Sequence, residues 1–446
     1  MESTIVASFD AANTEEGFLS LWLSDLLKEY GLGRGKSNHI AQKLESLAGE
    51  FDTLGDLHRA REYYDASLNW FGISSDAAKS AEMTMRVAEG WVKEAIARVS
   101  TEQPSHMVAA SFYENAIQVY RTIPRSERAV YRVDERIAEL RAHLNESGEK
   151  SLEEMRLIST PGVDINQIVE NARNAVKGKT PQDALKAFAN LHQGARAKQI
   201  RDDAIERLRS HPLQALFPAT VMSRDGRVIA KRPGMSLGGD SSDDESVIRS
   251  EMIRDYGILI SIVVQGDIWP ALEVMHMEHR LRESDFVGLA MQSPIVPRGR
   301  ERLFGKGLFA GYDRDFVTAL HLLVPQIEHM VRSHLKAAGA KTTNLDINGI
   351  ENENGLSSLM DLHEAAQVFG EDLSFEIKML FCDAFGPNLR NELAHGLITE
   401  EDCHSIYAIY AWWLALKLVF NTFWNAARRE EQETTEETEN GQAPEN

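Results

Sequence analysis

The stretch that decides how the C-terminal part of the chain folds is Gly386-Pro-Asn-Leu-Arg-Asn-Glu-Leu-Ala-His-Gly396, which lies between two strongly apolar segments. Pro387 and Asn388 are residue types found at helix starts, and Gly396 is the type found at helix ends. The sequence therefore predicts a short helix of about two turns inside this stretch.

This short helix carries side chains that suit phosphate chemistry. Asn391 and His395 are separated by one helical turn and share a face, and the long side chain of Arg390 reaches the same place from the first turn. An imidazole transfers protons near neutral pH, and a guanidinium stabilises the charge that develops on a phosphorane. We therefore select Arg390, Asn391 and His395 as candidate catalytic residues.

The spacing of an arginine and a histidine is a weak motif by itself, because it also occurs at Arg34–His39 in a polar loop. The C-terminal occurrence differs in its company, Leu389-Arg390-Asn391-x-x-Ala394-His395-Gly396, and in its helical setting. In these residues the chain resembles the HEPN superfamily of helical ribonucleases and ribonuclease-like domains. More narrowly, it is similar to a mostly bacterial family of unknown function with a C-terminal HEPN-like domain, a domain also found in a eukaryotic ER-membrane-associated RNA degradation protein.

Two upstream segments, Ser293–Glu301 and His321–Glu328, extend the resemblance, which covers about residues 210–425. The resemblance implies a metal-independent endoribonuclease, in which the 2′-hydroxyl attacks the neighbouring phosphate and leaves a cyclic phosphate and a 5′-hydroxyl. It further implies a homodimer whose two motif helices meet in one site, and a role in defence or RNA degradation. His395 would be the general acid and base, Arg390 the phosphate-stabilising cation and Asn391 a polar positioning residue.

Two points of the resemblance stay open. Glu328 either orients the motif arginine from a neighbouring helix or pairs with Arg332 on the surface. Some relatives carry a tyrosine two residues after the histidine, as a target for nucleotidylation, but Leu397 stands there in this chain. The alternative function is a non-catalytic HEPN-like helical scaffold that binds a protein partner through residues 1–150.

The charge of the chain bears on RNA binding. The net charge of −20 argues against unspecific coating of RNA, because such binding depends on neutralising phosphates. One concentrated basic patch nevertheless occurs, made of Arg298, Arg300, Arg302 and Lys306. These residues are either RNA-contacting or a surface loop tied to nearby carboxylates.

The helical periodicity predicts a mainly α protein. We expect a tetratricopeptide-like helical scaffold at 1–150, a helical linker domain at 151–310, a HEPN-like bundle at 311–430 and an acidic disordered tail at 431–446. A β-hairpin is expected near 216–231, with Asp225-Gly226 at its turn. The polar segment 342–355 is expected to be a loop.

The N-terminal region contains a recurring pattern, Ala60-x3-Tyr64-x2-Ser67 and Ala109-x3-Tyr113-x2-Ala116. Small, aromatic and small residues at this spacing are typical of paired tetratricopeptide-like helices, although two copies do not make a solenoid. An irregular helical domain and a partner-binding scaffold both fit. The expected core aromatics are Tyr63, Tyr64, Trp70, Phe71, Trp91, Phe112, Tyr113 and Tyr120.

Residues 312–338 are expected to form a long helix with one apolar stripe, and Pro325 is expected to kink or break it. Ile406–Trp424 is apolar enough to span a membrane, but Lys417 in its middle favours a buried core or dimer-interface helix. Two cysteines and an N-terminus without a signal-peptide pattern fit a cytosolic protein without a membrane anchor. No cofactor and no metal are expected, since the pair His276 and His279 has no third ligand at a supporting spacing.

Overall fold

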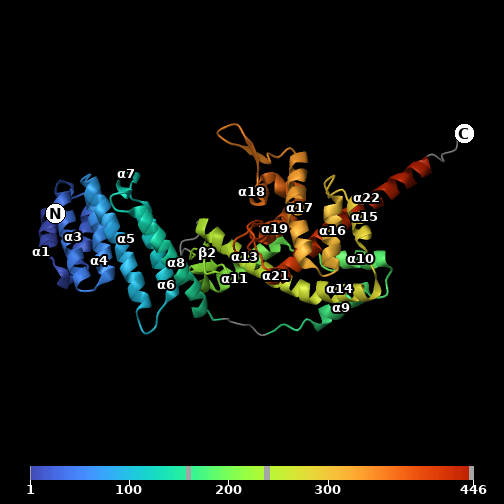
Figure 1. The fold of residues 1–446 in the computed structure, drawn as a ribbon, viewed down its shortest axis with the longest axis horizontal. Coiled ribbons are helices and arrows are strands. Elements are labelled where there is room, and N and C mark those ends of the chain that lie inside the picture. The colour runs from blue at the N-terminus through green and yellow to red at the C-terminus, as the bar shows by residue number, and fades with distance from the viewer. Residues whose placement is uncertain (1, 157–161, 236–241, 441–446) are drawn as a thin grey trace. The chain divides into compact units, whose positions relative to one another are not determined.

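The computed structural model describes residues 2–156, 162–235 and 242–440. The chain forms two compact units, one of Met1–Thr160 with Met222–Ile229 and one of Pro161–Val221 with Ala230–Asn446. Both are built almost wholly from helices, as the periodicity predicted (Figure 1).

The first unit is a row of helices in which chain neighbours pack side by side (Figure 1). Its elements are α1 Glu2–Ala11, η1 Thr14–Glu16, α2 Leu19–Glu29, η2 Arg34–Lys36, α3 Ser37–Thr53, α4 Leu57–Ile73, α5 Ala77–Val99, α6 His106–Arg121, α7 Arg125–Arg128 and α8 Val133–Glu154. The two copies of the small-aromatic-small pattern lie in α4 and α6, and their six residues are buried.

Six of the eight aromatic residues expected in this core are buried, and Trp91 and Phe112 are half-buried. Those two rings pack against each other with centroids 5.2 Å apart. The Arg61 guanidinium lies 3.5 Å from the centre of the Trp91 ring and covers it. Trp91 is therefore partly shielded by a cation rather than by core side chains alone.

The second unit begins with α9 and ends with the long α22. Its elements are α9 Asn166–Val176, α10 Pro181–Ala189, α11 Ala197–Ser210, α12 Pro212–Ala215, β1 Ala219–Met222, β2 Val228–Arg232, α13 Ser242–Ile262, the π-helix η3 Val263–Ile268, α14 Trp269–Glu278, α15 Glu283–Gln292, α16 Glu301–Tyr312, α17 Phe316–Ala337, β3 Thr343–Leu345, β4 Glu351–Glu353, α18 Leu356–Met360, α19 His363–Phe381, α20 Leu389–Ala394, α21 Glu400–Cys403 and α22 Ile406–Asn440. The turn end of the β1–β2 hairpin, Met222–Ile229, belongs to the first unit.

The main hydrophobic core of this unit includes residues from Ala172 to Phe420, and a small separate cluster is formed by Leu208, Ala215 and Val247. Helices on both sides of residue 310, the domain boundary expected from the sequence, contribute to the main core. The reason is α22, whose Trp412 and Trp413 are fully buried and donate hydrogen bonds to the carbonyls of Leu308 and Phe188, at 2.9 Å each. The apolar helix thus joins the two predicted regions.

Two helices, Asp244–Glu278 and Ile406–Arg428, are long and apolar enough to cross a membrane, and more than half of each apolar window is buried within the chain. In the first of them α13, η3 and α14 follow one another without a break. The π-helix lies just before Pro270. Proline has no backbone N–H, so it cannot donate the hydrogen bond that a regular α-helix would form at this position.

Helix α17 has the predicted apolar stripe, since Leu320, Leu323, Ile327, Val331 and Leu335 are all buried. The helix runs on through Pro325 without a break. Near the C-terminus, α22 continues as a helix to Asn440, although a disordered tail was expected from residue 431. The glutamates of this segment have good helix propensity, so they extend a helix that is already nucleated.

The β1–β2 hairpin lies where the sequence predicted it, with Gly226 at φ 78° in its turn. A second hairpin, β3–β4, occupies the segment that we expected to be a loop. Its strands are polar and mostly exposed, so they lack the apolar alternation that marks a strand. Asn348-Gly349 at its turn was the available signal.

Candidate active site

The motif helix α20 is short and sharply bounded, as the sequence predicted. Asn388, which precedes it, has φ 49° and ψ 37°, and Gly396, which follows His395, has φ 67°. Both are left-handed conformations, which asparagine and glycine adopt at lower cost than other residues. The backbone therefore turns sharply at each end of α20.

Arg390 is held in one orientation by α17. Its Nε donates to Oε2 of Glu328 at 2.7 Å, and its Nη2 lies 3.5 Å from Oε1 of the same carboxylate. Its Nη1 donates to Oδ1 of Asn391 at 3.1 Å. These contacts engage one N–H on each nitrogen, so Nη1 and Nη2 each keep a second N–H for another acceptor.

Glu328 serves two guanidinium groups at once. Its Oε1 accepts a hydrogen bond from Nη2 of Arg332 at 2.8 Å, one turn further along α17. Burial opposes ionisation of the carboxyl, but the hydrogen bonds from Arg390 and Arg332 outweigh it and hold the pKa of Glu328 below its usual value. Glu328 is therefore an anion, and both interpretations from the sequence, a contact with Arg390 and one with Arg332, are present together.

Arg332 links this carboxylate to the second hairpin. Its Nη2 also donates to the carbonyl of Asn354 at 2.7 Å, and its Nε lies 3.0 Å from Oε2 of Glu353. Gly355, the next residue, packs against Nη2 of Arg390, since a Cβ there would lie 3.5 Å from it. The sequence predicted Arg332 only as a surface partner of Glu328, and its contacts with Glu353 and Asn354 were not expected, because those residues are remote in the chain.

His395 is the C-cap residue of α20 and is exposed to solvent. Its backbone N–H donates to the carbonyl of Asn391 at 3.0 Å, while its imidazole has no hydrogen-bond partner among the described residues. Asn391 is fixed from both sides, because its Nδ2 donates to Oδ1 of Asn388 at 2.8 Å and its Oδ1 accepts from Arg390. The imidazole is thus open to a ligand, whereas the side chains of Arg390 and Asn391 are held by hydrogen bonds.

The predicted basic patch lies at the start of α16. Arg298, Arg302 and Lys306 are exposed and Arg300 is half-buried. Within the described parts of the chain, none of the four has a carboxylate within ion-pair distance. Backbone hydrogen bonds and the charge of Arg298 nevertheless lower the pKa of Glu301, so a carboxylate does lie near the patch, and both interpretations remain predictions.

Arg300 is the member of the patch that approaches the motif. Burial and the nearby charges of Arg300 and Arg332 lower the pKa of His329, which follows Glu328 on α17. The charge of Arg300, the residue before α16, thus acts on α17 at the residue that follows Glu328. No direct contact joins Arg298, Arg302 or Lys306 to α20 among the described residues.

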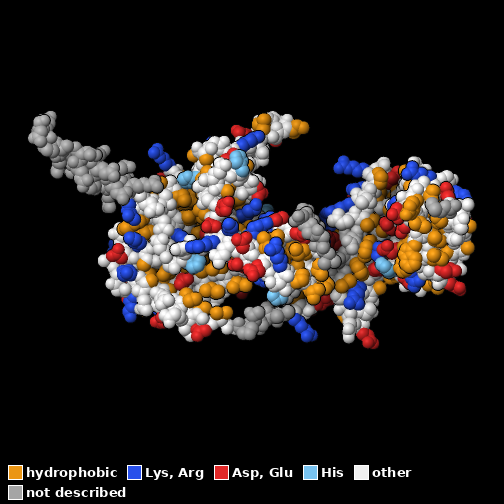
Figure 2. All heavy atoms as spheres, turned by 180° about the vertical axis from the view of Figure 1, so that it is seen from behind, with side chains coloured by type: hydrophobic (Ala, Val, Ile, Leu, Met, Phe, Trp, Pro, Cys, Tyr) orange, Lys and Arg blue, Asp and Glu red, His pale blue; other side chains and the backbone are white. Residues whose placement is uncertain are grey.

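The surface around these elements mixes acidic and basic side chains, and apolar side chains gather at the tip of the β3–β4 hairpin (Figure 2). Leu345, Ile347 and Ile350 at this tip are 66%, 100% and 57% exposed. The hairpin thus extends apolar groups into solvent from a base that is bound to the Arg390 cluster.

Comparison of the chain with protein-family models, with curated proteins and with solved structures gave no match.

Proposed function

We propose that the chain is a metal-independent endoribonuclease of the HEPN type. The observation that carries this proposal is the fixed position of Arg390. This arginine lies on the six-residue helix α20, is held by Glu328 of α17, and is followed at the end of α20 by the exposed His395. A positioned guanidinium with free N–H groups and an open imidazole, both carried by one short helix, would supply charge stabilisation and proton transfer.

In the proposed reaction, neutral His395 takes the proton from the ribose 2′-hydroxyl. The 2′-oxygen then forms a bond to the adjacent phosphorus, and Arg390 stabilises the additional negative charge on the phosphorane. The bond from phosphorus to the 5′-oxygen breaks, and that oxygen takes a proton from a protonated imidazole. The products are a 2′,3′-cyclic phosphate and a 5′-hydroxyl, so the reaction needs no metal, water or redox partner.

The two proton transfers occur on opposite sides of the phosphorus, so two imidazoles serve the reaction better than one. We propose that a second copy of the chain supplies the other pair of Arg390 and His395, through contact between the two C-terminal bundles. Asn391 would help to hold Arg390 in position, because its Oδ1 accepts a hydrogen bond from Arg390 while its Nδ2 donates to Asn388. Arg298, Arg300, Arg302 and Lys306 would bind phosphates of the RNA on either side of the cut.

The test is an RNA cleavage assay with the purified full chain in excess EDTA, followed by analysis of the product ends. We expect cyclic phosphate and 5′-hydroxyl ends, and a loss of at least about a hundredfold in rate for His395→Ala, because general acid–base catalysis contributes roughly that much. Since His395 is exposed, the melting temperature of this variant should stay within a degree or so of the wild type.

The chain offers a matched control, because Arg34 and His39 have the same spacing outside the site. Nε2 of His39 lies 2.7 Å from Oδ1 of Asp10, within hydrogen-bond distance, and His39→Ala should leave cleavage unchanged. Equal loss of activity in both histidine variants, or cleavage by His395→Ala at the wild-type rate, would refute the proposal.

A second candidate function is a non-catalytic scaffold, and one feature of the first unit favours it. Helix α2 exposes an apolar stripe at helical spacing, made of Leu19, Trp22, Leu26 and Tyr30, with Trp22 66% exposed. Stripes of this kind mark protein-binding surfaces. The scaffold function predicts no cleavage by the wild-type chain and a protein partner bound at α2.

A further inference from the structure

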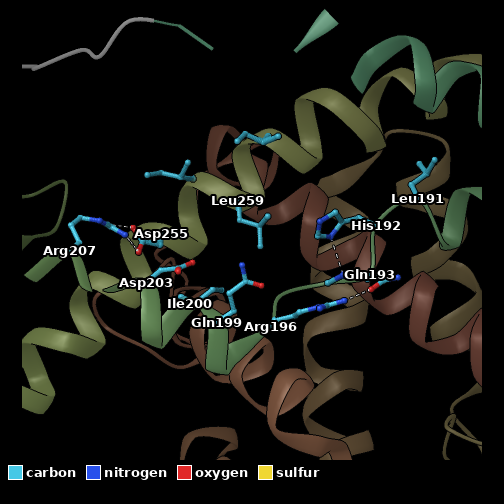
Figure 3. A pocket seen from close by; sticks show the side chains of 13 residues that line it. Leu191, His192, Gln193, Arg196, Gln199, Ile200, Asp203, Arg207, Asp255 and Leu259 are labelled. Carbon is cyan, nitrogen blue, oxygen red and sulfur yellow. Dashed lines mark hydrogen bonds and ion pairs between the residues drawn. The ribbon is translucent and has the colours of Figure 1, made fainter. Parts of the chain in front are cut away.

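A cavity of about 660 Å³ is lined by residues of α11, of α13 and of the loop before α11 (Figure 3). The loop between α10 and α11, residues 191–196, closes one end of it. This volume is typical of cavities that bind small molecules. None of Arg390, His395 and Glu328 lines this cavity, so it is separate from the proposed nuclease site.

The cavity is lined by one face of each helix. Its lining residues recur every three or four positions, as one helical face requires: Arg196, Gln199, Ile200, Asp203 and Arg207 at α11, and Asp255, Ile258, Leu259 and Ile262 on α13. The α13 wall is apolar apart from Asp255, whereas the α11 wall is largely polar. The cavity therefore presents an apolar surface opposite hydrogen-bonding groups.

One end of the cavity presents hydrogen-bond donors. Nδ1 of His192 accepts a hydrogen bond from the backbone N–H of Gly194 at 3.0 Å, so in the neutral ring the proton is on Nε2. Arg196 bonds only to the side chain of Gln193, at 2.9 Å, and no carboxylate of the described residues lies within ion-pair distance of it. His192 and Arg196 lie near each other at this end (Figure 3).

At the other end of the cavity the cation is Arg207, and its charge is already neutralised by a carboxylate. Arg207 binds both carboxylate oxygens of Asp255, and the exposed Asp203 adds a negative charge on the same side. Figure 3 shows this ion pair at the opposite side of the cavity from His192. An anionic group would therefore be attracted to Arg196 and repelled by Asp203. The two ends of the cavity thus differ in charge, and an anionic ligand would bind in one orientation.

We propose that this cavity binds a small organic acid. The acid group of the ligand lies against Arg196 and Nε2 of His192, and its apolar body lies along Ile258 and Leu259. Arg196 provides charge-assisted hydrogen bonds, and the α13 wall provides apolar contact. This proposal does not depend on whether the chain cuts RNA.

The test uses 8-anilinonaphthalene-1-sulfonate, an anion with an apolar aromatic body whose fluorescence rises on binding. We expect saturable binding to the full chain, and about tenfold weaker binding by Arg196→Gln, the loss of one charged hydrogen bond. Ile258 is 55% exposed, so Ile258→Glu should fold normally while its charge repels the probe. Decanoate should displace the probe from the wild-type chain.

Two further variants make the result specific. Ile258→Gln changes the same side chain without adding charge and should bind more tightly than Ile258→Glu. Arg201→Gln removes a guanidinium of α11 that pairs with Glu245 at 2.6 Å and does not line the cavity, so it should bind as the wild type does. Unchanged binding in both Arg196→Gln and Ile258→Glu, or the absence of saturable binding to the wild type, would overturn the proposal.

Discussion

Glu328 is the residue on which the geometry of the proposed site depends most. Its side chain is 14% exposed and lies between two guanidinium groups, so Glu328→Gln would leave two half-buried cations competing for one neutral amide. We expect the free energy of unfolding at pH 7 to fall by about 2 kcal/mol. Chemical denaturation measures this loss, and Glu371→Gln, at an exposed carboxylate, is the control that should change little.

The pKa of Glu328 gives the same substitution a pH dependence. Because the folded-state pKa lies below the unfolded-state value of about 4.3, the stabilisation is complete above that value and is lost as the pH falls through the folded-state pKa. The difference in unfolding free energy between the wild type and Glu328→Gln should therefore shrink below about pH 4. A difference that stays constant down to pH 3 would show that the carboxylate charge is not what stabilises the cluster.

The π-helix η3 contains a carboxyl whose titration has the opposite sign. Burial raises the pKa of Asp267 to about 6, so the folded chain binds the proton more tightly than the unfolded chain does. Stability therefore falls as the pH rises from about 4 to about 6, and the cost persists above that range. Asp267→Asn should be more stable than the wild type by about 2 kcal/mol at pH 7.5 and equal to it near pH 4.

Thermal melts of both chains across this pH range test the effect of Asp267. The control is Asp313→Asn. Asp313 is exposed and lies two residues before Asp315, the N-cap residue of α17. If Asp267→Asn gave no gain at pH 7.5, the carboxyl would have to be ionised at little cost in the folded chain.

The β3–β4 hairpin is attached to the proposed site through Arg332. Its strands bury little surface, and Arg332 bonds to Glu353 and Asn354 at its base while it bonds to Glu328 on the other side. We expect Arg332→Met to increase amide hydrogen exchange both in residues 343–353 and in α20, because the hairpin and Glu328 lose the same anchor. Lys336→Met, one turn along α17 and exposed, should change neither. Faster exchange in the hairpin alone would mean that Arg390 does not need Arg332.

These elements also show what the sequence could predict. The bounds of α20 and the position of the β1–β2 hairpin follow from Asn388, Gly396 and Asp225-Gly226, whose preferences act within a few residues. The contact of Arg390 with Glu328 joins residues 62 positions apart, and sequence reasoning offered it only as one of two alternatives. The β3–β4 hairpin was missed because polar side chains and Arg332 hold it, and neither produces an apolar pattern.

The largest departure from the sequence prediction concerns the molecule as a whole. The boundary predicted near residue 310 assumed that α22 forms the core of the C-terminal bundle alone. No local sequence feature indicates that Trp412 and Trp413 donate hydrogen bonds to the carbonyls of Leu308 and Phe188. Burial against partners more than a hundred residues away is a property of the fold. The chain accordingly has two compact units, each with buried clusters of its own.

Two units with separate cores should unfold separately, and three tryptophans test this. Trp70 is buried in the first unit and Trp412 in the second, whereas Trp22 is exposed. In calorimetry we expect two transitions. Trp70→Ala should lower the temperature of one transition and Trp412→Ala that of the other. Each substitution should reduce the unfolding free energy of its own unit by about 3–5 kcal/mol, the usual cost of deleting a buried aromatic ring. Trp22→Ala should move neither. If both core variants shifted a single transition, the residues 222–229 that return to the first unit would couple the two cores into one cooperative structure.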